Sequence, residues 1–372
     1  MSHSAPDPVP QGRGGPLDAL RFIAALLIVL YHFGADAPVE LAALHPVFAR
    51  GYLATDFFLI LSGYVLGRAY GPGILAGRIG FGDFLKKRLT RVWPAQLMVL
   101  AALGAVVLLA GLIGAAPAHP DHFSLRAMVM QALLVQAWGL PGGGGWNHQS
   151  WSLSALVVCY AAFPLTWRWI SRMVSPSALL ALGMAAVMVG DLICLRVFEH
   201  HIYDLDFSLG VVRTAPLFLL GVCIARVVEQ GRPSVGMARL LAWLAGATLV
   251  LLQLTGRFDL PSIFAIAAIV LALGRLPVQR PSRLIEAGAK LSFALFITHA
   301  LTGLVWFGGM KALSGRLRLE PWMDWAMWAG SIPAALVGAA LFHRLVDRPV
   351  QAWLVGRRDR RRVARAAGLV NV

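Results

Sequence analysis

Charged residues are scarce in this 372-residue chain: Asp, Glu, Lys and Arg make up 14% of it, against 58% for hydrophobic residues. A soluble globular domain carries roughly 25% charged residues and about 45–50% apolar ones. The shortage excludes an ordinary water-soluble domain, because most of the length lacks the polar surface that water requires. We therefore expect an all-α fold, a polytopic bundle of transmembrane helices.

Acidic residues are scarcer than basic ones, with 18 Asp and Glu against 33 Lys and Arg, so the net charge is +15. In a soluble protein such an excess would suggest nucleic acid as a partner. Here the basic residues lie between apolar runs, as the positive-inside rule predicts for cytoplasmic loops. Membrane lipids are therefore expected partners, and nucleic acid is not.

Cysteine is rare as well. Cys159, Cys194 and Cys223 lie inside apolar segments and form no CxxC pair, which predicts small core residues rather than a disulfide framework or a zinc site. The loop EHHIYDLD (199–206) contains metal-ligating residue types, but their spacing is generic, and a solvated loop is the favoured interpretation. No metal site is predicted.

Apolar runs of the length that a bilayer requires, about 20 residues, recur along the chain. They centre on 17–35, 52–70, 94–115, 151–170, 177–195, 210–228, 239–255, 260–275, 290–310 and 323–343, which makes ten spans. An eleventh run, 126–140, is short and contains Gln131 and Gln136. A full crossing there would place basic loops outside, so we predict a re-entrant or half-length segment.

This topology has a transmembrane domain over 17–349, a disordered tail before it (1–16) and a basic tail after it (350–372). The charge pattern predicts that both termini are cytoplasmic. One loop disagrees with the rule, because it would place three basic residues outside, namely Lys311, Arg316 and Arg318.

The first span contains ionisable residues, which are costly inside a membrane and are therefore functional candidates. Asp18 and Arg21 are three residues apart and can pair on one helical face. His32 follows eleven residues after Arg21, almost on the same face and about 16 Å further along. The alternatives are an anchoring role for Arg21 and an interfacial position for His32.

Polar residues also mark the next two spans. Asp56 lies near the outer end of the second span, and Ser62 and Gly63 lie in its middle, where glycine permits close helix approach. Arg88 and Arg91 lie three residues apart before the third span. They are either topology and headgroup contacts or a clamp for the phosphates of a nucleotide-bearing cofactor.

A glycine tract leads into the next candidates, His148, Trp151 and Ser152, and His299 lies within a late span. Trp151 is either an interfacial anchor or a stacking platform for a sugar ring. For His299 the alternative to a role at the site is a hydrogen bond between helices.

Seven stretches, in this order along the chain, resemble the membrane acyltransferase-3 family, which includes bacterial surface-polysaccharide and O-antigen O-acetyltransferases. They are LDALRFIAALLIVLYHF (17–33), TDFFLILSGY (55–64), KKRLTRVWP (86–94), WSLS (151–154), Phe163-Pro164, SFALFITH (292–299) and DRP (347–349). The resemblance implies a ten-helix enzyme of a bacterial-type inner membrane. Such an enzyme passes an acyl group from cytoplasmic acyl-CoA to a sugar hydroxyl.

By this resemblance His32 is the leading catalytic residue, Arg21 is required, and Arg88 and Arg91 bind the donor, acetyl-CoA by default. No cofactor is expected to stay permanently bound. His32 could deprotonate the acceptor hydroxyl or carry the acyl group as an acyl-imidazole, with Asp56 orienting its ring.

The acceptor is expected to be a carbohydrate, an exopolysaccharide or a lipid-linked glycan, held by His148, Trp151, Ser152 and His299. Polysaccharide synthesis or export proteins are further candidate partners. Two rival functions remain open at this point, a glycan or lipid transporter and a non-catalytic subunit of an export machine.

One position departs from the family pattern. The family usually has an acidic residue two positions after WSLS, and this chain has Leu156 there. Asp56, Asp18 or His148 could substitute for the missing carboxylate; otherwise the acceptor differs or the chemistry is impaired.

Overall fold

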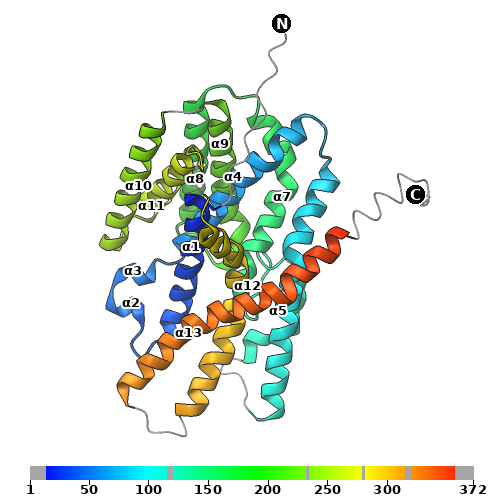
Figure 1. Ribbon diagram of the computed structural model, residues 1–372, viewed down its shortest axis with the longest axis vertical. Helices are drawn as coiled ribbons and strands as arrows, with labels where there is room; N and C mark the ends of the chain where they lie inside the picture. Colours follow the sequence, from blue (N-terminus) through cyan, green and yellow to red (C-terminus); the bar gives the residue numbers. More distant parts are fainter. Residues whose placement is uncertain (1–13, 115–119, 232–233, 279–280, 315–319, 357–372) are drawn as a thin grey trace, which may run out of the picture.

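The computed structural model describes residues 14–114, 120–231, 234–278, 281–314 and 320–356. Within these ranges the chain is helical, without a β-strand (Figure 1). The long helices are α1 (Pro16–Phe33), α4 (Leu53–Leu75), α5 (Phe81–Leu112), α7 (Trp151–Ile170), α8 (Pro176–Phe198), α9 (Gly210–Gln230), α10 (Val235–Thr255), α11 (Asp259–Gly274), α12 (Arg283–Ser314) and α13 (Pro321–Phe342). The shorter ones used below are α6 (Leu125–Leu133), two 3₁₀ turns, η3 (His148–Ser150) and η4 (Phe207–Leu209), and a π-helical turn, η5 (His343–Asp347).

Each of the ten expected spans corresponds to one long helix, which confirms the helical transmembrane bundle. Among the described residues, nine helical segments are long and apolar enough to cross a membrane. The tenth, α11, has 16 residues, or about 24 Å, which is short of the roughly 30 Å hydrocarbon core. The last segment continues from α13 through η5 to Gly356. The predicted tails fall mainly on 1–13 and 357–372, outside the described residues.

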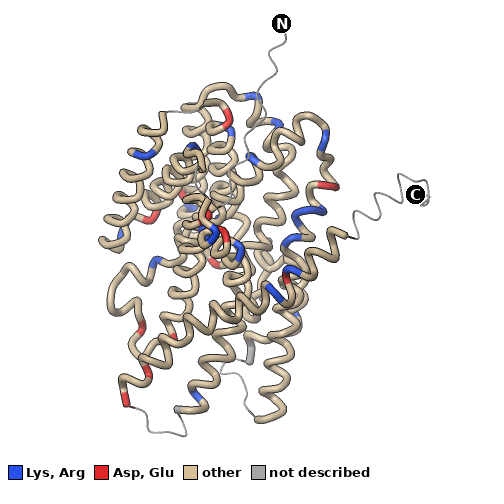
Figure 2. Tube along the Cα trace, in the orientation of Figure 1, with Lys and Arg blue, Asp and Glu red and all other residues tan. Residues whose placement is uncertain are grey.

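The candidate residues form two groups along the bundle (helices in Figure 1): Arg21 lies near the start of α1 and Arg88 and Arg91 in the first third of α5, whereas His32 lies in the last turn of α1 and contacts His299 of α12. Lys and Arg lie mostly in the upper half of the view, where α1 begins, whereas the lower end shows mainly Asp and Glu (Figure 2). We call these ends the arginine end, after Arg21, Arg88 and Arg91, and the histidine end, after His32, His148 and His299.

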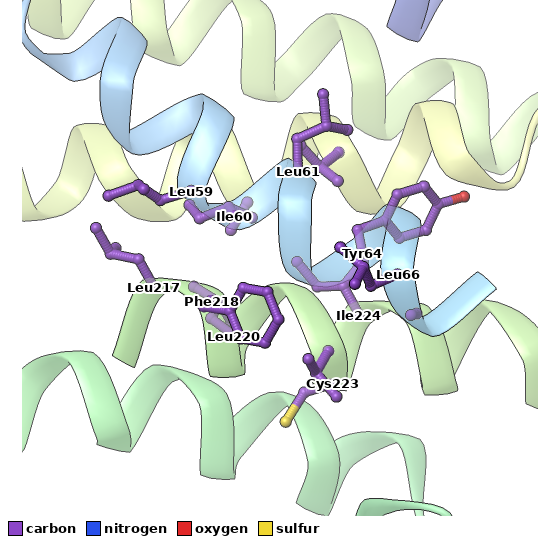
Figure 3. Packing of buried hydrophobic residues seen from close by; sticks show 14 of the residues in the cluster. Leu59, Ile60, Leu61, Tyr64, Leu66, Leu217, Phe218, Leu220, Cys223 and Ile224 are labelled. Atoms are coloured by element: carbon purple, nitrogen blue, oxygen red, sulfur yellow. The ribbon is translucent and has the colours of Figure 1, made fainter. Parts of the chain in front are cut away.

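The centre of the bundle is the crossing of α4 and α9, where two backbones touch. A Cβ added at Gly63 would lie 2.1 Å from the Phe218 carbonyl oxygen, and one at Gly221 would lie 1.9 Å from the Ile60 carbonyl oxygen. The predicted role of Gly63 in close helix approach is therefore confirmed; Ser62 beside it is half-buried. Apolar side chains fill the space along both helices around this crossing (Figure 3).

The eleventh apolar run forms the half-length helix α6 and a return loop, and buried amides hold both in place. Gln131 donates to the carbonyl oxygens of Gly143 and Gly145 and accepts from the Asn147 amide. Asn147 in turn donates to Gln96 of α5, at 2.9 Å. Gln131 thus satisfies a non-helical backbone inside protein, whereas Gln136 donates to the Ser150 hydroxyl at 2.9 Å.

Three smaller predictions concern isolated side chains. The three cysteines are buried and unpaired, as expected for core residues. In the 199–206 loop, His201 contacts Asp191 at 3.1 Å. Lys311 lies at the histidine end, where Asp36 and Asp324 line the same pocket. Arg316 and Arg318 lie outside the described residues.

Candidate active site

Helix α1 links the two ends of the bundle. Near its start, Asp18 accepts a hydrogen bond from the Gly14 amide at 2.7 Å and pairs with Arg21 at 3.4 Å. The predicted Asp18–Arg21 pair is therefore present, and its carboxylate sits where the helix dipole favours negative charge. His32 lies in the last turn of the same helix, so Arg21 and His32 belong to different ends.

His32 stacks on His299 of α12. Their ring centroids are 5.2 Å apart and their planes differ by 29°. His32 is half-buried, and no hydrogen bond to its ring nitrogens occurs in the described part of the chain. Residues 267 positions apart in sequence are thus brought face to face, next to Phe33.

The protonation pattern of His299 follows from its surroundings. Its Nδ1 lies 2.7 Å from the Phe296 carbonyl oxygen and 3.2 Å from that of Leu295. A carbonyl oxygen can only accept, so Nδ1 must carry the proton, and Nε2 of the neutral ring keeps a free lone pair. Nε2 is buried and has no hydrogen-bond partner among the described residues.

His148 completes a group of three imidazoles. It begins η3, immediately before α7, and its ring packs edge-on against Phe207 at 4.7 Å. His32 interacts electrostatically with both His148 and His299. The structure therefore gathers three histidines from three separate elements at one end of the bundle.

Trp151 and Ser152 begin α7 next to this group but make structural contacts. The Arg213 guanidinium lies 5.7 Å from the Trp151 ring, and a Cβ at Gly210 would come within 2.6 Å of the same ring. The Ser152 hydroxyl is 3.5 Å from the Gln149 carbonyl oxygen. A sugar-stacking role for Trp151 stays a prediction.

Asp56 does not orient His32, contrary to the expectation from sequence. Both carboxylate oxygens accept hydrogen bonds from the Arg213 fork, at 2.9 Å each, and the pair is buried between α4 and α9. Arg213 also donates to the Tyr203 carbonyl oxygen. Arg213 thus engages both oxygens of the carboxylate, so Asp56 joins α4 to α9.

At the arginine end the two motif arginines have different partners. Arg91 forms an ion pair with Asp347 of η5 at 2.7 Å and lies over the Phe293 ring. Arg88 donates to the Tyr70 hydroxyl at 2.6 Å and lies 4.7 Å from the centre of that ring. No carboxylate in the described part of the chain forms an ion pair with Arg88.

Comparison with known proteins identifies a family and two relatives. The model of a family described as an acyltransferase domain matches residues 16–344. The chain belongs to this acyltransferase family. Acyltransferase MdmB of Streptomyces mycarofaciens is 28% identical over 384 residues, covering 92% of each chain. Protein 2 in the picA locus of Rhizobium radiobacter is 32% identical over 187 residues, which cover 46% of this chain and 91% of that one. No solved structure matches.

Family membership makes the protein a membrane acyltransferase and decides against the transporter and subunit functions. The site of this acyltransferase lacks the acidic residue after WSLS, and Leu156 is buried in the apolar core in its place. Of the three proposed substitutes, Asp56 is bound by Arg213 and Asp18 lies at the arginine end. His148 alone is close enough to His32 for the two to interact electrostatically.

The structure shows several ion-paired residues that sequence patterns did not identify. Arg213 carried a usable signal, because it is an ionisable residue inside an apolar run. Asp347 belongs to the DRP motif, but nothing in that motif names Arg91 as its partner. The buried Arg50–Asp259 pair, at 2.7 Å, joins residues far apart in sequence, and no local pattern reveals it.

Proposed function

We propose that this membrane acyltransferase moves an acyl group, acetyl by default, from acyl-CoA to a hydroxyl group of a carbohydrate. The donor enters at the arginine end, which we assign to the cytoplasmic side of a bacterial-type inner membrane, with both termini there. The acceptor, an exopolysaccharide or a lipid-linked glycan, meets the acyl group at the histidine end. Acyl-CoA is a substrate in this scheme, and no cofactor stays bound between turnovers.

One observation carries the proposal: α1 holds Arg21 near one end and His32 at the other, about 16 Å apart. Coenzyme A has the same polarity, with phosphates at one end and a thioester at the end of its extended pantetheine arm. Guanidinium groups bind phosphates, and an imidazole suits acyl transfer. A donor lying along the bundle would place its phosphates at the arginines and its thioester at His32.

His32 is the residue expected to touch the reacting groups. It is half-buried, and no described residue forms a hydrogen bond with its ring. A neutral imidazole can take the proton of an attacking hydroxyl, or attack the thioester itself and carry the acyl group. In either route the C–S bond of the thioester breaks, a C–O bond to the acceptor forms, and the hydroxyl proton ends on the CoA thiol.

The test is transfer of label from acetyl-CoA by the purified, detergent-solubilised protein to methyl glycosides of glucose, mannose and galactose. We expect wild type to transfer label and His32→Ala to lose at least about 100-fold of the rate, with an unchanged chromatographic profile. The matched control is His200→Ala, which removes an exposed histidine outside the group of three.

Two results would count against the proposal. Full transfer by His32→Ala would remove His32 from the chemistry. A wild-type protein that neither binds acetyl-CoA nor accepts label would show the donor to be wrong. Label transfer to a glycan extract but not to the glycosides would support the proposed acceptor and show that a single sugar is too small to be one.

A further inference from the structure

The two arginines of the R-x-x-R pair differ in how their charge is balanced. Arg91 faces the Asp347 carboxylate at 2.7 Å, and that carboxylate is only 3% exposed. No carboxylate lies within 4 Å of Arg88 among the described residues, and its Nε is buried without a partner. A phosphate approaching Arg91 meets a neighbouring negative charge, whereas one approaching Arg88 does not.

Asp347 is held in place by its own neighbours. It lies in the π-helical turn η5, and its second oxygen is 3.3 Å from Nδ1 of His343. One turn further on, Gln351 donates to the Thr90 carbonyl oxygen at 3.0 Å. The end of the last span is thus clamped to α5 at the point where Arg91 projects, and π-helical turns often mark functional positions.

Tyr70 gives Arg88 a partner that leaves both groups available. Its hydroxyl oxygen accepts the bond from Arg88, so the hydroxyl proton is free to be donated elsewhere. The ring lies against the guanidinium and fixes its position. Both side chains are half-buried, so a ligand can reach them. A guanidinium beside a free O–H donor is complementary to a phosphate oxygen.

We infer that a phosphate of the donor binds to Arg88 and the Tyr70 hydroxyl, and that Arg91 instead forms a structural ion pair with Asp347. The inference rests on the proposed function in taking acyl-CoA as the donor. It divides a motif of two identical residues into one binding residue and one positioning residue, and it adds Tyr70 to the donor site. Arg91 acts through α5, whose placement against η5 holds Arg88 at the site.

The experiment measures equilibrium binding of acetyl-CoA and of acetyl-dephospho-CoA, which lacks the 3′-phosphate, to the purified full-length protein. Arg88→Gln should weaken acetyl-CoA binding at least about tenfold, and Tyr70→Phe about fivefold. Arg91→Gln should lower the unfolding temperature, because it removes the arginine charge that balances a buried carboxylate. Arg91→Gln combined with Asp347→Asn should recover that stability and bind acetyl-CoA within about twofold of wild type.

The two ligands identify the phosphate. If Arg88→Gln weakens only acetyl-CoA, the site holds the 3′-phosphate; if it weakens both ligands equally, the site holds the diphosphate. The inference is overturned if the Arg91–Asp347 double variant loses binding as much as Arg88→Gln does. Unchanged binding by Arg88→Gln overturns it as well.

The same experiment distinguishes failure of the proposed function from failure of the inference. If wild type binds neither ligand, the donor is wrong, and pyrophosphate is then used as the probe at Arg88. The ion-pair half of the inference does not depend on the donor, because it predicts the stability of Arg91→Gln and its recovery in the double variant. No recovery there overturns that half, whatever the donor.

Discussion

Two helix pairs at the heart of this acyltransferase bury polar groups in opposite ways. Where α4 crosses α9, the backbones touch at Gly63 and Gly221, and the charges of Asp56 and Arg213 neutralise each other through two hydrogen bonds. Where α1 meets α12, the His32 and His299 rings stack, and His299 keeps a buried nitrogen that has no partner among the described residues.

This difference distinguishes a helix pair with a structural role, α4–α9, from one with a proposed catalytic role, α1–α12. Leaving a buried polar atom unpaired costs roughly 1–3 kcal/mol, and most native structures avoid that cost. The α4–α9 crossing avoids it for its ion pair by complete pairing. The α1–α12 contact retains it beside the half-buried His32, as expected for an atom that is paired only when substrate is bound.

The largest expected effect comes from Gly221→Ala. Its Cβ would lie 1.9 Å from the Ile60 carbonyl oxygen, so the two backbones must separate along the whole crossing. We expect a loss of more than about 4 kcal/mol of stability, or no folded protein at all. Thermal unfolding in detergent and the yield of monodisperse protein measure it.

The matched control for this change is Gly246→Ala in α10. That glycine is also helical, but a Cβ there meets nothing within 4 Å. Helix propensity makes alanine equal to glycine or better there, by up to about 1 kcal/mol. Equal losses in the two variants would mean that glycine matters for flexibility in general and not for the α4–α9 contact.

A smaller loss is expected from Arg213→Ala, which leaves the Asp56 carboxylate buried and unpaired between α4 and α9. Breaking a buried pair in this way costs about 3 kcal/mol or more. The double variant Asp56→Leu/Arg213→Met should regain most of the stability, because apolar residues replace both charges, though the Tyr203 carbonyl still loses its donor. Chemical unfolding in detergent compares the three proteins.

The second part of this prediction concerns activity. If Asp56 only joins two helices, the double variant should retain acyl transfer close to wild type. If the double variant is as stable as wild type but inactive, Asp56 is needed for catalysis, although the structure pairs it with Arg213.

Whether a structural feature could be predicted from the sequence depends on how far apart in the chain the interacting residues lie. The spans follow from composition, and the Asp18–Arg21 pair and the role of Gly63 follow from spacing or residue type within one helix. The half-length segment follows from the distribution of charge among loops. None of these depends on which helix packs against which, so each could be predicted.

Partners across the bundle could not be predicted. Asp56 and Arg213 are 157 positions apart, and Arg91 and Asp347 are 256 apart. Helix packing decides which carboxylate pairs with which arginine. The hydrophobic periodicity of the sequence contains no information about that pairing. The sequence therefore marked Asp56 as a candidate and assigned it the wrong neighbour.

The variant His299→Asn gives the sharpest test of the contrast between the α4–α9 and α1–α12 contacts. Asparagine can still donate a hydrogen bond toward the Phe296 carbonyl oxygen, as Nδ1 does now, but it has no counterpart of Nε2. If His32 carries the acyl group and Nε2 of His299 accepts the proton of the acceptor hydroxyl, this change should slow transfer to a hydroxyl acceptor by about 100-fold, or roughly 2.7 kcal/mol, with little loss of stability.

Hydroxylamine distinguishes a lost base from a distorted site. It attacks a thioester as a free amine and needs no deprotonation beforehand, so His299→Asn should acetylate it at close to the wild-type rate after subtraction of the uncatalysed reaction. Thr298→Ala is the control for packing, because it removes a neighbouring buried hydroxyl that bonds only to the Ala294 carbonyl oxygen. Equal loss with hydroxylamine and with a glycoside would make the unpaired nitrogen a feature of packing, and the contrast between the two helix pairs would then be one of geometry alone.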